Sequence, residues 1–135
     1  MSLEQVKEII NDAGMMFVAT EDNDQPRVRP MMSILTDSNT ILTSTFKPAR
    51  KMAQIKNNPK VEVCFVDKKL DHCRIEGAIA ISQDKPKKEF LFNNVPILRQ
   101  FFASSDDPNF ILLEITPSRI EMMMIGERGY TDVPL

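Results

Sequence analysis

The sequence predicts a mainly β protein of the α+β class, an antiparallel barrel of six or seven strands with short flanking helices. Several segments alternate apolar and polar residues, and this period of two is typical of half-buried strands. Turn-forming residues separate neighbouring segments by only a few positions, so most strands are expected to pair as hairpins. Helical spacing occurs only at the N-terminus and between strands, which indicates helices that flank the barrel.

The chain is expected to be a single domain over residues 1–135. Its length fits one domain, and its 42% hydrophobic and 27% charged residues are ordinary for a globular protein. The net charge of −2 gives no basic surface for duplex DNA. No apolar run reaches the roughly 20 residues that cross a bilayer, and the N-terminus lacks the apolar stretch of a secretory signal. Two cysteines are too few for a disulfide scaffold, so we expect a cytoplasmic protein with neither nucleic-acid nor membrane partners.

The first half of the chain contains signals for two helices and three strands. Ser2 and Gln5 fit a capping box, and Gly14 fits the stop signal of the helix that follows. The polar run EDNDQP lies between two extended segments and indicates a hairpin turn. Pro48 fits the first turn of a helix, and an Asn-Asn-Pro sequence ends that helix. In order, the expected elements are a helix at 3–13, a hairpin at 15–34, a strand at 40–45 and a helix at 48–57.

The second half is predicted to contain strands and two short helices. Ile75, Ile79 and Ile81 lie on one face of an alternating segment, as in a strand. Asp84 fits a helix N-cap, and Pro117 is expected to break the last extended region into two strands. The tail after residue 125 is expected to be a loop or an extended arm. In order, the expected elements are strands at 61–67 and 73–82, helices at 87–93 and 97–102, and strands at 110–116 and 119–125.

The composition excludes several kinds of chemistry. One histidine, His72, and two cysteines cannot supply three or four nitrogen and sulfur ligands for zinc, so no metal site is expected. The four glycines form no phosphate-binding loop of the Rossmann or Walker type. No nucleophile motif accompanies His72, and no other catalytic residue is identifiable. If the protein is an enzyme, a bound cofactor is expected to carry the chemistry.

Basic residues gather around the start of the second helix. Arg27 and Arg29 alternate on one strand, and a Thr/Ser-rich strand leads into a helix whose first turn carries Arg50 and Lys51. The N-terminus of a helix attracts anions, whereas basic side chains there oppose the helix dipole. This unfavourable placement is explained if the site binds a phosphate group. The other interpretation, a surface turn with scattered charges, stays open from the residues alone.

Three segments in this order resemble the pyridoxamine 5′-phosphate oxidase-like FMN-binding split barrel family. They are RVRPMM at 27–32, TILTSTFKPARKMAQIKNNPKVEVCFVD at 40–67 and RIEGAIAIS at 74–82. The likeness extends from the first helix to about Ile125. The resemblance implies a split β-barrel, FMN as the cofactor, and a homodimer that binds FMN at the subunit interface.

The resemblance also implies which residues contact FMN. Residues at the family's positions are expected to contact the phosphate, the ribitol or the isoalloxazine ring of FMN, and one of them reaches the flavin from a neighbouring strand. They are Arg29 and Lys51, with Arg50 assisting, for the phosphate; Ser44 and Thr45 for the phosphate and ribitol; Pro30, Met31 and Met32 along the ring; and His72 from the neighbouring strand.

Departures from the family pattern narrow the expected activity. The true oxidases carry a basic residue where this chain has Ile34, and their substrate-binding C-terminal segment is not recognisable in IGERGYTDVPL. The histidine motif of nitroimidazole-reductase-like relatives is replaced by TSTFKPARK. We therefore do not expect pyridoxamine phosphate oxidation. The expected function is hydride or electron transfer between a reduced nicotinamide and a small organic acceptor.

Two alternatives stay open. The first is a non-catalytic flavin-binding protein with a sensing, storage or stress role, because no catalytic residue is identifiable. The second keeps the fold but replaces FMN with a deazaflavin or haem, although a single histidine makes haem less attractive. Structural roles are expected for the remaining notable side chains. The methionines at 122–124 are assigned to the core or a dimer interface. Phe90, Phe92, Phe101 and Phe102 are assigned to packing of the helices on the barrel, and coverage of the flavin by one of them stays open.

Overall fold

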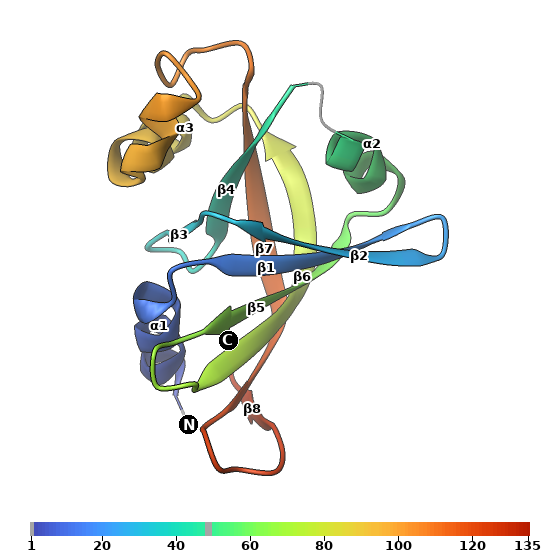
Figure 1. The fold of residues 1–135 in the computed structure, drawn as a ribbon, viewed down its shortest axis with the longest axis vertical. Coiled ribbons are helices and arrows are strands. Elements are labelled where there is room, and N and C mark those ends of the chain that lie inside the picture. Colours follow the sequence, from blue (N-terminus) through green and yellow to red (C-terminus); the bar gives the residue numbers. More distant parts are fainter. Residues whose placement is uncertain (1, 48–49) are drawn as a thin grey trace.

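The structure is a computed structural model that describes residues 2–47 and 50–135. Within these ranges it contains one eight-stranded sheet, three α-helices and a 3₁₀-helix (Figure 1). The elements are α1 (Leu3–Asp12), β1 (Met16–Asp22), β2 (Gln25–Met31), β3 (Ile34–Leu35), β4 (Ile41–Phe46), α2 (Arg50–Asn57), β5 (Lys60–Val66), β6 (His72–Ser82), α3 (Lys85–Asn94), η1 (Pro96–Gln100), β7 (Phe110–Met123) and β8 (Thr131–Val133).

The strand order explains why the sheet curves into a barrel. Neighbours in the sheet follow the order β2-β1-β5-β6-β7-β4-β3, every pair is antiparallel, and β8 adds to β7. The two strands at the ends of this order, β2 and β3, are consecutive in the chain and joined only by Met32 and Ser33. A flat sheet cannot bring its outer strands so close, so the sheet must curl. The predicted fold class is confirmed, with the short strands β3 and β8 added.

The prediction that Pro117 separates two strands was wrong. A single strand, β7, runs from Phe110 to Met123, and its pairing with β6 changes register between Glu76 and Gly77. Ser118 is the extra residue of this bulge, and its hydroxyl donates to the Glu76 carbonyl oxygen at 3.1 Å. Proline lacks the N–H that a regular ladder needs, and a bulge accommodates it without ending the strand.

The N-terminal caps of α1 and α3 form between residues that lie three positions apart in the sequence. The Ser2–Gln5 capping box forms as predicted, and Asp84 accepts a hydrogen bond from the Lys87 backbone N–H at 3.0 Å. The predicted role of Gly14 was wrong, because α1 ends at Asp12, its C-cap Ala13 is extended, and Gly14 has no positive φ. None of the described helices is long and apolar enough to span a membrane.

Strand β4 separates two apolar cores. Ile41 lies in the barrel core, which also contains the buried face of α1 and the inner faces of β1, β5, β6 and β7. Leu42, on the opposite face of β4, lies in a second core beneath α3 and η1. Lys87 of α3 forms a salt bridge with Glu114 of β7 at 2.8 Å, which attaches α3 to the sheet. Figure 1 shows α3 and α2 on opposite sides of the upper end of the sheet.

The two cysteines are free and lie on the paired strands β5 and β6. Cys73 is fully buried in the barrel core, and burial raises the pKa of its thiol to about 12. Burial also raises the pKa of Cys64, which is partly exposed on the outer face of β5. A thiol reacts as the thiolate, so these raised pKa values favour inert side chains.

Candidate functional site

A pocket of about 320 Å³ lies between β2, the end of β4 and the 3₁₀-helix η1. It brings together five of the residues that the sequence assigned to a flavin site: Pro30, Met31, Met32, Ser44 and Thr45. The other lining residues are Met15, Phe46, Ile97, Leu98, Phe101 and Phe102. Ligand pockets commonly enclose about 300–1,000 Å³, so this one lies at the small end of that range.

The gap between β2 and β3 positions the first wall of the pocket. Strand β2 ends at Met31 and β3 begins at Ile34, so Met32 and Ser33 lie outside the strands. The hydroxyl of Thr43 donates to the Met32 carbonyl oxygen at 2.6 Å and fixes this segment against β4. Backbone near the end of a strand is thereby placed at a pocket surface, where it can meet the polar edge of a ligand.

Strand β4 contributes hydroxyl groups to the same pocket. Thr45 is almost fully buried, whereas Ser44 is half-buried. Adjacent residues of a strand point to opposite faces, and both line the pocket because it wraps around the end of β4. The result is a mixed wall with small hydroxyl side chains in the middle and larger apolar side chains toward η1.

Four phenylalanines form the apolar side of the pocket and its support. Phe46 and Phe101 meet edge to face with ring centroids 5.8 Å apart, and Phe46 packs on Phe102 at 4.8 Å. Phe102 in turn packs on the fully buried Phe110 at 4.9 Å. Sequence analysis assigned Phe101 and Phe102 to helix packing, and Phe102 does pack in the second core. Both rings also line the pocket, which agrees with the alternative that one of these phenylalanines covers a ligand.

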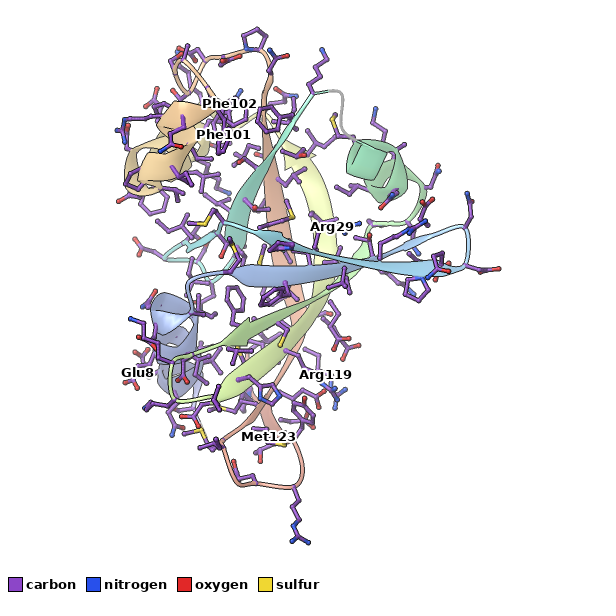
Figure 2. The ribbon with its side chains drawn as sticks, in the orientation of Figure 1. Glu8, Arg29, Phe101, Phe102, Arg119 and Met123 are labelled. Carbon is purple, nitrogen blue, oxygen red and sulfur yellow. The ribbon has the colours of Figure 1, made fainter. Side chains whose placement is uncertain are left out.

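Arg29 lies beside the pocket, in contact with α2. Its guanidinium donates to the Thr20 hydroxyl at 2.7 Å and to the Gln54 side-chain oxygen at 3.2 Å. Thr20 also donates to Gln54 at 3.1 Å, and both partners are buried. Figure 2 shows Arg29 on the α2 side of β4 and Phe101 and Phe102 on the α3 side. A cationic end and an apolar end therefore lie on opposite sides of β4.

Helix α2 begins at Arg50, and its first turn contains no acidic residue. The sequence RKMAQIKN therefore places Arg50 and Lys51 at the end where backbone N–H groups lack helical partners. Gln54, one turn further on, is the residue that binds Arg29. The side chains of Arg50 and Lys51, and all of Pro48, lie outside the described residues.

His72 lies away from the pocket, on the outer face at the start of β6. Its Nε2 is 2.7 Å from the Tyr130 hydroxyl, and the Arg74 guanidinium lies 3.7 Å from the centre of the Tyr130 ring. Arg74 also binds the buried carboxylate of Glu121, and this bond raises the pKa of Arg74. Tyr130 thus packs against its own chain. His72 does not belong to the lining of the pocket.

Comparison with known proteins gives a consistent picture. A family model described as pyridoxamine 5′-phosphate oxidase matches residues 2–124. General stress protein 26 of Bacillus subtilis (strain 168) is 28% identical over 132 residues, which cover 93% of this chain and 90% of that protein. The crystal structure of general stress protein 26 from Bacillus anthracis str. Sterne has a TM-score of 0.80 and 27% identity, covering 96% of each chain.

One further solved structure shares the fold. It is a pyridoxamine 5′-phosphate oxidase-related, FMN binding protein from Nostoc punctiforme PCC 73102. Its TM-score is 0.75 at 15% identity, over 96% of this chain and 87% of that chain. At this level of identity the likeness shows a common fold alone.

Proposed function

The chain belongs to the pyridoxamine 5′-phosphate oxidase family, and on that basis we propose that it is an FMN-binding oxidoreductase of the cytoplasm. The observation that carries the proposal is the pocket, which gathers Pro30, Met31, Met32, Ser44 and Thr45 on the elements that flank Arg29, a cationic residue of β2 whose guanidinium binds Gln54 of α2. We take residues 1–135 to act as one FMN-binding split-barrel domain. The electron donor is a reduced nicotinamide, and the acceptor is a small organic molecule.

The chemistry of the described side chains fits an FMN molecule oriented across β4. The isoalloxazine ring would lie along Pro30, Met31 and Met32, where the lining is apolar and the backbone leaves the sheet. The hydroxyls of Ser44 and Thr45 suit the ribitol and phosphate. Arg29, with Arg50 and Lys51 at the start of α2, would bind the phosphate through charge-assisted hydrogen bonds.

In this proposal the protein binds and orients the cofactor and excludes water from it. When bound, FMN supplies the capacity to accept a hydride and release electrons singly or in pairs. The described part of the pocket lining contains no ionisable side chain. This observation favours one alternative, a flavin-binding protein without catalytic turnover, which would serve in sensing, storage or a stress response.

Direct binding separates these possibilities. Dialysed protein should take up FMN and quench its fluorescence, and riboflavin should bind at least about tenfold more weakly because it lacks the phosphate. Addition of NADH or NADPH without oxygen should then bleach the bound flavin. FMN uptake without bleaching would favour the non-catalytic alternative. Protein that takes up no FMN would contradict the proposal, and mass analysis of any released chromophore would identify a deazaflavin or haem instead.

We also propose that the protein is a homodimer and that the pocket lies at its interface. An apolar patch covers the outer face of β1 and its neighbours, formed by Met15, Phe17, Val28 and Val66. Phe17 is 42% exposed and pairs with Pro30 of β2 and Cys64 of β5. Met15 and Pro30 belong both to this face and to the pocket lining. Exposed apolar patches of this kind typically mark interfaces, and a second copy here would adjoin the FMN site.

Phe17→Ser tests the dimer. Sedimentation of the unchanged protein should give twice the chain mass of 15.4 kDa, and Phe17→Ser should raise the dimer dissociation constant by about tenfold, because each copy loses a buried ring. Leu70→Ser is the matched control, since Leu70 is 60% exposed in the turn between β5 and β6. An unchanged protein that sediments as a monomer would exclude the dimer.

A further inference from the structure

The mouth of the pocket is apolar and exposed. Phe101 is 53% exposed, Phe46 is 48% exposed and Ile97 is 41% exposed, yet all three line the same pocket. Exposed apolar side chains that gather around a cavity typically mark a binding surface. Within the described lining the polar side chains are Ser44 and Thr45, which lie on β4 rather than on η1.

These rings are held in place before any ligand arrives. Phe46 lies between Phe101 and Phe102, and Phe102 packs on Phe110 in the second core. A surface fixed in this way loses little conformational entropy on binding. The wall is also remote from the cationic end of the site, because Arg29 faces α2 on the other side of β4.

We propose that Phe101, with Phe46 and Ile97, forms a specificity-determining wall for a second ligand that is planar, aromatic and uncharged, such as a quinone. The inference rests on the proposed function, because FMN binding along Pro30–Met32 leaves this opposite wall facing the second ligand. Aromatic rings stack on or meet the edges of other rings, so flat ligands gain most from this wall. An anionic ligand would lose its hydration without a described cationic partner at the mouth.

Binding to the FMN-loaded protein tests the inference without relying on turnover. The probe is 2,3-dimethyl-1,4-naphthoquinone, whose substituted ring does not add the free thiols of Cys64 and Cys73. The comparator is naphthalene-2-sulfonate, which has a flat ring of similar width and a negative charge. NMR spectra of protein labelled at its methionine methyl groups show where the quinone binds. Ring currents should shift Met15, Met31 and Met32, which line the pocket, and leave Met122 unchanged because it lies in the barrel core.

Phe101→Ala should weaken quinone binding by about five- to tenfold and change the FMN dissociation constant less than about twofold. Phe90→Ala is the matched control, because Phe90 is 41% exposed on α3 and does not line the pocket. About half of each side chain is exposed to solvent, so both variants should fold.

Each other outcome overturns the inference in a recognisable way. If the sulfonate binds as tightly as the quinone, or Phe101→Ala leaves quinone binding unchanged, the wall does not select the ligand while FMN binding stands. If Phe101→Ala alters the sedimenting mass, Phe101 is a subunit contact instead. If the unchanged protein takes up no FMN, the proposed function fails first and this inference falls with it.

Discussion

Arg29→Ala should weaken FMN binding by about 10- to 100-fold, which corresponds to the loss of one or two charge-assisted contacts. Arg29 is half-buried between β1 and α2, where its guanidinium is already oriented by Thr20 and Gln54. A phosphate at the start of α2 would meet a donor whose position is fixed in advance. The FMN dissociation constant is measured from the quenching of flavin fluorescence.

Two control variants make this result specific. Arg27 lies on the same face of β2 and is exposed, with Asp22 at 3.9 Å, so Arg27→Ala should change FMN affinity less than about threefold. Arg29→Lys keeps the positive charge but loses the planar guanidinium group, so its FMN affinity should lie between those of Arg29→Ala and Arg27→Ala. Riboflavin affinity should be insensitive to Arg29→Ala. Equal loss of FMN and riboflavin binding would show that Arg29 supports the structure rather than the phosphate.

Gly77→Ala should lower the free energy of unfolding by about 1–3 kcal/mol, because the added methyl group has no room. A Cβ at this position would lie 2.6 Å from the Thr116 carbonyl oxygen, which belongs to the backbone of β7 and cannot rotate away. Gly77 pairs with Pro117 at the bulge, so relief would require β6 and β7 to separate. Urea denaturation followed by circular dichroism measures the loss.

Gly14→Ala is the matched control. A Cβ at Gly14 would have no atom within 4 Å, and its φ is not positive, so this substitution should leave the unfolding free energy within about 0.5 kcal/mol. Equal unfolding midpoints for Gly77→Ala and Gly14→Ala would show that the β6–β7 bulge can widen at no cost. The bulge would then not constrain the two long strands.

Features that depend on neighbouring residues were predictable from the sequence. The capping box of Ser2 and Gln5, the N-cap of Asp84 and the end of α2 at Asn57 all follow from groups a few positions apart. The hairpin of β1 and β2 likewise follows from a turn whose Asn23 and Asp24 adopt positive φ. Both residue types tolerate this conformation better than most.

Features that depend on a distant strand were not predictable in the same way. Pro117 would end an isolated strand, but the bulge at Glu76 and Gly77 accepts it, and that pairing joins residues about 40 positions apart. The pocket shows the same division. Pro30–Met32 and Ser44–Thr45 carry a family pattern in the sequence, whereas Phe101 reaches Phe46 only because η1 folds back over β4.

The position of β4 between two apolar cores has a consequence for divergence among relatives. Ile41 packs in the barrel core, whereas Leu42 packs in the second core with residues of α3 and η1. Because the two cores are separate, the segment from Asp84 to Asn109 can accumulate substitutions without disturbing the barrel core. Transplanting this segment from a homologue should then change the preference for the second ligand, while the proposed binding of FMN is retained. Such modularity would let one ancestral scaffold serve many small molecules.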